Sequence, residues 1–218
     1  MEKSNKEIFN ECCLQIAAAC EPYGYKYYKS KKKMMKQVGC FTAEVHFASS
    51  TYNIQGSYLE FNTSCKMINT ATGKVYWNLP LYQLREGKGK VWNLAKERFR
   101  ERELTEIIKI LQEKFFPLAE SYGTNIEGVI QNVVDSGWFI GHDKTDIYLL
   151  EVLDLVADFG TQEQVTECVH HYIRHLPKDV QQRFKFDYRL YQSSGQTAST
   201  INNRKLIPFM VERGIRYP

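Results

Sequence analysis

Polar and apolar residues alternate along most of the chain between Tyr25 and Leu84. Within Phe41–Phe47 every second residue is apolar, and Ser57–Ile68 repeats the pattern. A period of two places alternate side chains on opposite faces of an extended strand, so it indicates strands buried on one side only. The alternation therefore predicts a small antiparallel sheet with one apolar face and one polar face.

Turn residues divide this run into four predicted strands. They cover Tyr25–Tyr28, with Lys29–Gln37 as its continuation or as an exposed hairpin, then about Gly39–Ala48, Ser57–Ile68 and Val75–Leu79. The connections between successive strands are short, which favours an antiparallel meander. Pro80 cannot donate a ladder hydrogen bond and therefore limits the last strand to an edge or an end.

Helical patterns flank the sheet on both sides. A helix begins after Ser4 or Asn5 and ends at Pro22 and Gly24. Five or six helices follow, over about 94–116, 126–136, 145–158, 161–177, 178–192 and 205–213. Segregated strands and helices predict an α+β fold: an N-terminal helix, a four-stranded antiparallel meander and a C-terminal helical block. We expect residues 1–93 to form the helix and sheet, with the helical region 94–218 packed on them in one globular unit.

Composition narrows the class of protein. Hydrophobic residues make up 43% and charged residues 25% of the 218 positions, as in ordinary soluble proteins. No apolar stretch approaches the roughly 20 residues of a membrane span, and the charged N-terminus is unlike a signal peptide. The six cysteines lack zinc-type spacing, which indicates buried, reduced thiols. We therefore expect a cytoplasmic protein that does not associate with membranes.

The net charge of +4 is unevenly distributed. Residues 1–93 hold 13 Lys and Arg against 7 Asp and Glu, and residues 94–218 hold 16 against 18. The excess is concentrated in Lys29–Lys36, where five lysines lie next to three tyrosines. Lysines interleaved with aromatic residues suit nucleic-acid binding. They equally suit an edge strand protected against aggregation, and the absence of arginine favours that second interpretation.

Two groups of residues around histidines are candidate chemical sites. His171 and His175 have the i, i+4 spacing of metal ligands, but a helix C-terminus also favours their positive charge. His142 lies beside Asp143 and Asp146, where helix capping explains the same residues. The sequence accordingly predicts no catalytic residue, no metal ligand and no cofactor.

The polar face of the predicted sheet is the candidate interaction surface, provided that the helices cover the other face. Such a mixed polar and aromatic surface is typical of protein interfaces. The candidate residues on this face are His46, Tyr58 and Glu60, with Trp77 flanking it and Lys31, Lys32 and Lys33 of the basic patch completing the candidate surface.

Several segments together resemble an uncharacterised bacterial α+β domain family. They are the helix ending in Cys20-Glu21-Pro22-Tyr23-Gly24-Tyr25-Lys26, the strands Phe41–Phe47 and Tyr58–Ile68, and Phe116-Pro117-Leu118 before a short amphipathic helix. The resemblance covers about residues 5–135. It implies a helix followed by a meandering sheet and helices, with no established activity, and some members are suspected to be immunity proteins against bacterial toxins.

The sequence thus favours a non-enzymatic protein-interaction module of immunity or regulatory type, with a protein partner. One alternative is a nucleic-acid-binding protein that uses Lys29–Lys36. Another is an enzyme with a site near His142 or His171.

Overall fold

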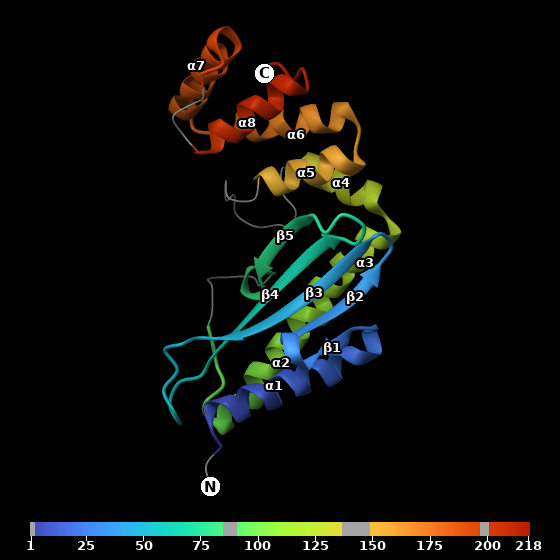
Figure 1. The fold of residues 1–218 in the computed structure, drawn as a ribbon, viewed down its shortest axis with the longest axis vertical. Helices are drawn as coiled ribbons and strands as arrows, with labels where there is room; N and C mark the ends of the chain where they lie inside the picture. Colours follow the sequence, from blue (N-terminus) through green and yellow to red (C-terminus); the bar gives the residue numbers. More distant parts are fainter. Residues whose placement is uncertain (1–2, 85–90, 137–148, 197–200) are drawn as a thin grey trace. The chain divides into compact units, whose positions relative to one another are not determined.

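The computed structural model describes residues 3–84, 91–136, 149–196 and 201–218, and it divides the chain into two units (Figure 1). Unit 1 is Met1–Asn125 and unit 2 is Ile126–Pro218. The division lies after Asn125 and not after residue 93, because the long helix that follows the sheet belongs to unit 1. The α+β class predicted from the sequence is confirmed.

The N-terminal helix α1 spans Asn5–Cys20 and begins at the predicted cap. The Glu7 N–H donates to Ser4 Oγ at 3.3 Å, and the Ser4 N–H donates to Glu7 Oε2 at 2.7 Å. This reciprocal capping box satisfies two backbone donors that the first helical turn would otherwise leave unbonded. A single 3-10 turn, Glu21–Tyr23, and Gly24 in the left-handed conformation then end the helix.

The sheet is an antiparallel meander in the order β1-β2-β3-β4-β5, as predicted, with β6 paired to β4. Its strands are β1 Lys26–Tyr28, β2 Lys33–Val38, β3 Phe41–Ser49, β4 Glu60–Asn69, β5 Val75–Pro80 and β6 Trp92–Asn93. It has six strands and not four for two reasons. A 3-10 turn at Lys29–Lys31 divides the predicted first strand, with Lys32 left-handed at φ 49°. The two-residue β6 is too short to show a period.

The helices of unit 1 cover the apolar face of the sheet (Figure 1). α2 spans Glu97–Ile110 and continues through a π-helical segment, Leu111–Phe115, into α3, Phe116–Thr124. On the sheet side this face is built by buried residues of β3 and β4, namely Phe41, Ala43, Val45, Phe47, Phe61, Cys65 and Met67. The predicted strand faces are therefore confirmed. Within unit 1, the helices leave the polar face of the sheet uncovered.

Pro117 does not break the helix. Since proline has no N–H, the helix cannot form its usual i→i−4 bond there. The preceding segment widens instead, and the Phe116 N–H donates to Leu111 O, five residues back. The helix then continues to Thr124.

Unit 2 consists of five described helices: α4 Ile126–Ser136, α5 Leu149–Phe159, α6 Gln162–His175, α7 Lys178–Ser194 and α8 Ile201–Glu212. A capping box opens α6, with Gln164 N–H donating to Thr161 Oγ1 at 3.2 Å. No helix in the described parts of the two units is long and apolar enough to cross a membrane.

All six cysteines are free thiols, and only Cys40 is exposed. Burial raises the pKa of Cys12 to about 11 and the pKa of Cys20 to about 12. These two thiols therefore remain protonated at neutral pH.

Two glycines allow α3 to approach the turn between β2 and β3. A Cβ atom on Gly123 would lie 2.8 Å from the Val38 carbonyl carbon and 2.9 Å from the Gly39 nitrogen. Both are backbone atoms, which cannot move aside as a flexible side chain can. The end of α3 and the β2–β3 turn therefore stay in contact only while position 123 has no side chain.

We predict that Gly123→Ala lowers the free energy of unfolding by about 1–3 kcal/mol, the usual cost of overpacking. Alanine in an exposed helix would ordinarily add up to about 1 kcal/mol of stability, so the sign of the change tests the close approach. Urea denaturation measures it. Thr124→Ala, at the exposed neighbouring position, should change stability by less than about 0.5 kcal/mol.

Candidate protein-interaction site

The lysines of Lys29–Lys36 do not form one basic surface. Lys32 donates to Asn10 Oδ1 of α1 at 2.6 Å, Lys33 pairs with Glu44 on the polar face, and Lys36 pairs with Glu120 of α3. Only Lys29 and Lys31 are exposed. Because neighbouring residues of a strand point to opposite faces, a cluster in the sequence is separated in the structure.

The polar face of the sheet contains an ion cluster centred on Glu44. Glu44 is only 6% exposed and accepts hydrogen bonds from Lys33 and from His46 Nε2, the latter at 2.6 Å. Burial acts to raise the pKa of Glu44, but these two bonds and charges outweigh it and hold the pKa below its ordinary value. Lys66 lies opposite Glu44 on β4 and adds a further positive charge to this face.

This cluster has the chemistry of a structural ion pair. Ser64 lies opposite His46 across β3 and β4, but in the described structure no hydrogen bond joins the two side chains. Nε2 of the imidazole faces the carboxylate. A serine nucleophile needs its base within hydrogen-bond reach. Ser64 and His46 therefore do not form a nucleophile–base pair in the described structure.

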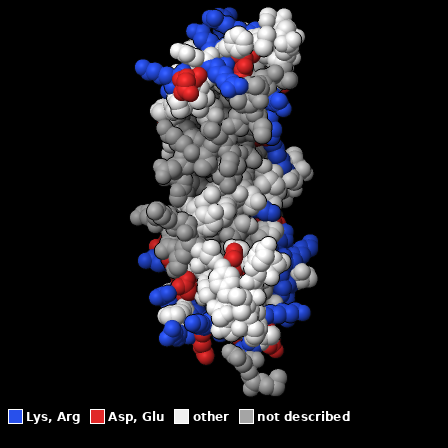
Figure 2. Space-filling view, turned by 90° about the vertical axis from the view of Figure 1, so that its left-hand side faces the viewer, with Lys and Arg blue, Asp and Glu red and all other residues white. Residues whose placement is uncertain are grey.

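A second feature, the 50–58 loop, connects β3 to β4. It projects from unit 1 in Figure 1 and belongs to the uncharged area in the lower part of Figure 2, around which both basic and acidic side chains lie. Residues 47–59 contain no Asp, Glu, Lys or Arg, although a quarter of the chain is charged. The Tyr52 side chain is 83% exposed and the Ile54 side chain 62%. Tyr52 is the most exposed large hydrophobic residue among those described.

The loop is fixed on one side by the N-terminus of α1. Gln55 Oε1 accepts from the Asn5 N–H at 3.0 Å, and Gln55 Nε2 donates to Lys3 O at 2.8 Å. Asn5 Nδ2 also donates to Tyr58 O at 3.3 Å. One side chain of the loop thus bonds the backbone of the segment where α1 begins.

On its other side the loop is fixed by the segment that leads into α2. Asn93 Oδ1 accepts from the Leu59 N–H at 3.0 Å, and Asn93 Nδ2 donates to Ser57 O at 3.2 Å. Within the loop, the Ile54 and Tyr58 backbones exchange hydrogen bonds of 2.8 and 2.9 Å. These bonds restrain residues 54–59 of the loop, while Tyr52 and Ile54 remain exposed.

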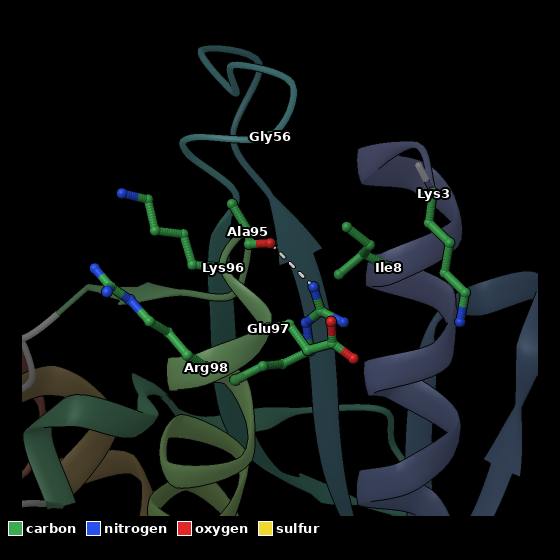
Figure 3. A pocket seen from close by; sticks show the side chains of 8 residues that line it. Lys3, Ile8, Gly56, Ala95, Lys96, Glu97 and Arg98 are labelled. Atoms are coloured by element: carbon green, nitrogen blue, oxygen red, sulfur yellow. Dashed lines mark hydrogen bonds between the residues drawn. The ribbon is translucent and has the colours of Figure 1, made fainter. Parts of the chain in front are cut away.

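A pocket of about 690 Å³ lies beside the loop, between the starts of α1 and α2 (Figure 3). Figure 3 shows Ile8 pointing into it from α1, while Lys96 and Arg98 extend side by side from the start of α2. The Arg100 guanidinium donates to Ala95 O at 3.0 Å and to Leu94 O at 2.9 Å. Gly56 brings the loop to the rim of this pocket.

The predicted candidate residues lie in three different places: at the base of the loop, on the polar face and in the core. Tyr58 and Glu60 lie at the base of the loop, where the Tyr58 hydroxyl donates to Glu60 Oε2 at 3.0 Å and this bond raises the pKa of Tyr58. His46 lies on the polar face, as predicted, and Lys33 lies opposite it there. Trp77 does not lie on this face: it is 0% exposed, faces the helices and donates to the Tyr122 hydroxyl at 2.9 Å. Tyr76 is also buried.

Of the two histidine groups, only His171 and His175 lie among the described residues. The rings of His171 and His175 stack with centroids 4.2 Å apart, and His175 Nδ1 bonds the His171 carbonyl. No group of three or more potential metal ligands occurs in the described parts of the chain. His142, Asp143 and Asp146 lie outside the described residues.

Comparison of the chain with family models, with curated proteins and with solved structures finds no match. The resemblance to a bacterial α+β family therefore stays a prediction, and the site must be interpreted from its own residues.

We predict that Glu44→Gln destabilises the protein at pH 7 by about 1–3 kcal/mol, because Lys33 then lies partly buried without its carboxylate. The pKa of Glu44 is lower in the folded than in the unfolded state, where it is about 4.5. Its contribution is therefore present above that pH and is lost as the pH falls through the folded-state pKa. Urea denaturation between pH 7 and pH 3 should show the two proteins converging in acid. Glu113→Gln, an exposed control, should behave as wild type.

We also predict that Gln55→Ala accelerates amide hydrogen exchange in the 50–58 loop while leaving the strands protected. The substitution removes the two bonds of the Gln55 side chain to the Lys3 and Asn5 backbones and leaves the bond from Asn5 Nδ2 to Tyr58 O, so the Ser57 and Tyr58 amides open more often. Exchange measured by NMR or mass spectrometry checks this. Loop exchange equal to wild type would contradict the prediction and would show that the Asn5 and Asn93 bonds hold the loop without Gln55.

Proposed function

We propose that this protein is a non-enzymatic protein-interaction module and that the 50–58 loop is its binding element. The observation that carries the proposal is a loop that is hydrogen-bonded through residues 55–59 to α1 and to Asn93, yet exposes Tyr52 and Ile54. In a mobile loop, exposed apolar side chains sample many conformations. In this loop, hydrogen bonds restrain the backbone already in the unbound protein.

The composition of the loop supports a protein partner. Tyrosine, serine, asparagine and glycine dominate the 50–58 loop, as they dominate antibody binding loops, where tyrosine supplies contact area and the small polar residues supply hydrogen bonds. Binding to a pre-ordered loop avoids much of the entropy lost when a flexible loop is immobilised. A tyrosine and an isoleucine exposed close together are suited to act as the buried anchors of an interface.

Single exposed hydrophobic residues are common on protein surfaces and need no function. Phe186 of α7, 65% exposed, is such a residue. The 50–58 loop differs because its two exposed residues occur in an uncharged segment with its own anchoring bonds. Nucleic-acid binding through Lys29–Lys36 is less well supported, since three of the five lysines are engaged with α1, the polar face and α3.

Whether the module serves immunity or regulation depends on the partner. An immunity protein against a nuclease would need an acidic, phosphate-like surface, and the loop itself is uncharged. An immunity role would therefore require a partner that is not a nuclease.

We predict that a photo-crosslinking residue, benzoylphenylalanine, forms a discrete protein adduct in cells when it replaces Tyr52. The same residue at Ala71, in the exposed turn between β4 and β5, should form none. Mass spectrometry identifies the captured protein. Equal capture at both positions would show nonspecific reactivity and would contradict the proposal.

The purified captured protein then allows a quantitative test by calorimetry. Tyr52→Ala should weaken its binding by at least about 30-fold, the effect of truncating an interface anchor of about 2 kcal/mol. Thr72→Ala, in the β4–β5 turn, should have no effect. Unchanged affinity of the Tyr52→Ala variant would exclude the loop as the binding element.

A further inference from the structure

We propose that the partner of the 50–58 loop presents carboxylate side chains to a cationic rim beside the loop, formed by Lys3, Lys96, Arg98 and Arg100. This inference rests on the proposed function and adds the chemical nature of the partner. The rim and the loop are adjacent, because Gly56 lines the same pocket as the four cations.

Among the described residues that line this pocket, the four cations outnumber the carboxylates. Glu97 is the one carboxylate among the residues that line the pocket. Lys3 pairs with Glu11 at 2.8 Å, but both side chains are about half exposed, so this bond is weak. Lys96 and Arg98 form no ion pair within the part of the chain that the structure describes. The hydrogen bonds of Arg100 to Leu94 O and Ala95 O satisfy donors without cancelling its charge.

Two of these cations, Lys96 and Arg98, lie at the start of α2, where positive charge is unfavourable in the unbound protein. A helix N-terminus carries partial positive charge and favours carboxylates. Lys96 is the N-cap residue and makes no side-chain capping bond, while Arg98 lies in the first turn. The Arg98 guanidinium lies 4.5 Å from the centroid of the Phe99 ring, which steadies it in an exposed position. Carboxylates from a partner would relieve both the mutual repulsion and the unfavourable helix-end field.

The arrangement fits an acidic protein better than a nucleic acid. A nucleic-acid strand follows a continuous track of cations along its backbone. The rim is instead bordered by the uncharged residues 47–59, and the lysines of Lys29–Lys36 are distributed over separate surfaces. Cations at the edge of an uncharged aromatic patch reproduce the polar rim and less polar centre of protein interfaces.

The probe for this inference is a short peptide of alternating Glu and Ser, titrated into the isotope-labelled full chain and followed by NMR. We expect chemical-shift changes at the amides of residues 96–100, with affinity that falls steeply when salt is added. A peptide of alternating Gln and Ser should cause none. The double variant Lys96→Glu and Arg98→Glu should lose at least tenfold in affinity for the acidic peptide. The double variant Lys109→Glu and Lys114→Glu, which makes the same charge change further along the helix, should keep it.

Three results would overturn the inference. They are an acidic peptide that leaves residues 96–100 unshifted, an oligothymidine of similar length that binds the rim more tightly, and sulfate ions that match the affinity of the peptide. The second would indicate a nucleic acid and the third a small-anion site. Tyr52→Ala should leave the titration unchanged, so failure of the loop in the crosslinking experiment and failure of the rim here remain separate outcomes.

The rate of association with the purified captured protein provides a second readout. Charge reversal at Lys96 and Arg98 should lower the association rate by about tenfold or more at low salt and reduce its salt dependence, as expected for charges at the edge of an interface. Tyr52→Ala should act mainly on the dissociation rate. A rate of association that is independent of salt and of both cations would reject an acidic partner.

Discussion

Burial of one face of the sheet against α1, α2 and α3 is the constraint on which the rest of unit 1 depends. The Phe9 and Phe61 rings lie 5.3 Å apart between α1 and β4, and Trp77 reaches from β5 to the Tyr122 hydroxyl of α3. A buried Trp and Tyr that bond each other satisfy their polar atoms inside an apolar core. Because the strand period is two, fixing this face also fixes every side chain of the polar face. The Glu44 cluster and the base of the 50–58 loop are both positioned in this way.

The same constraint explains why the sequence predicted the sheet well and its surface less well. Alternation within β3 and β4 gave their faces correctly, since a strand buried on one side has no other stable register. Lys33 and Lys36 are close in the sequence but lie on opposite faces of the sheet. Lys32 has a left-handed backbone conformation that no sequence pattern predicted. Trp77 was assigned to the surface because an aromatic residue in an edge strand suits either face. Its place depends on Tyr122, which is 45 residues away along the chain.

The 50–58 loop was only partly predictable. Its polar, turn-forming residues marked it as a connection, and the absence of charge over residues 47–59 was a signal that could have identified it as a binding surface. What the sequence could not reveal is its rigidity. The anchors are Gln55 and Asn93, which act through contacts with α1 and with the backbone of the loop base. Both are polar residues outside any periodic pattern, so only the folded chain shows why the loop is ordered.

Loop and rim would contribute to binding in different ways. Burial of Tyr52 and Ile54 removes apolar area from water at about 25 cal/mol per Å², an interaction that forms late and keeps a complex together. The charges of Lys96 and Arg98 act over about 10 Å at moderate salt and therefore influence approach and orientation first. Because the loop is uncharged and the cations lie beside it, one surface can combine apolar burial at its centre with charge attraction at its edge. No charge at the centre then has to lose its water. That division requires the loop to stay fixed relative to the start of α2, which the Asn93 bonds to Ser57 and Leu59 provide.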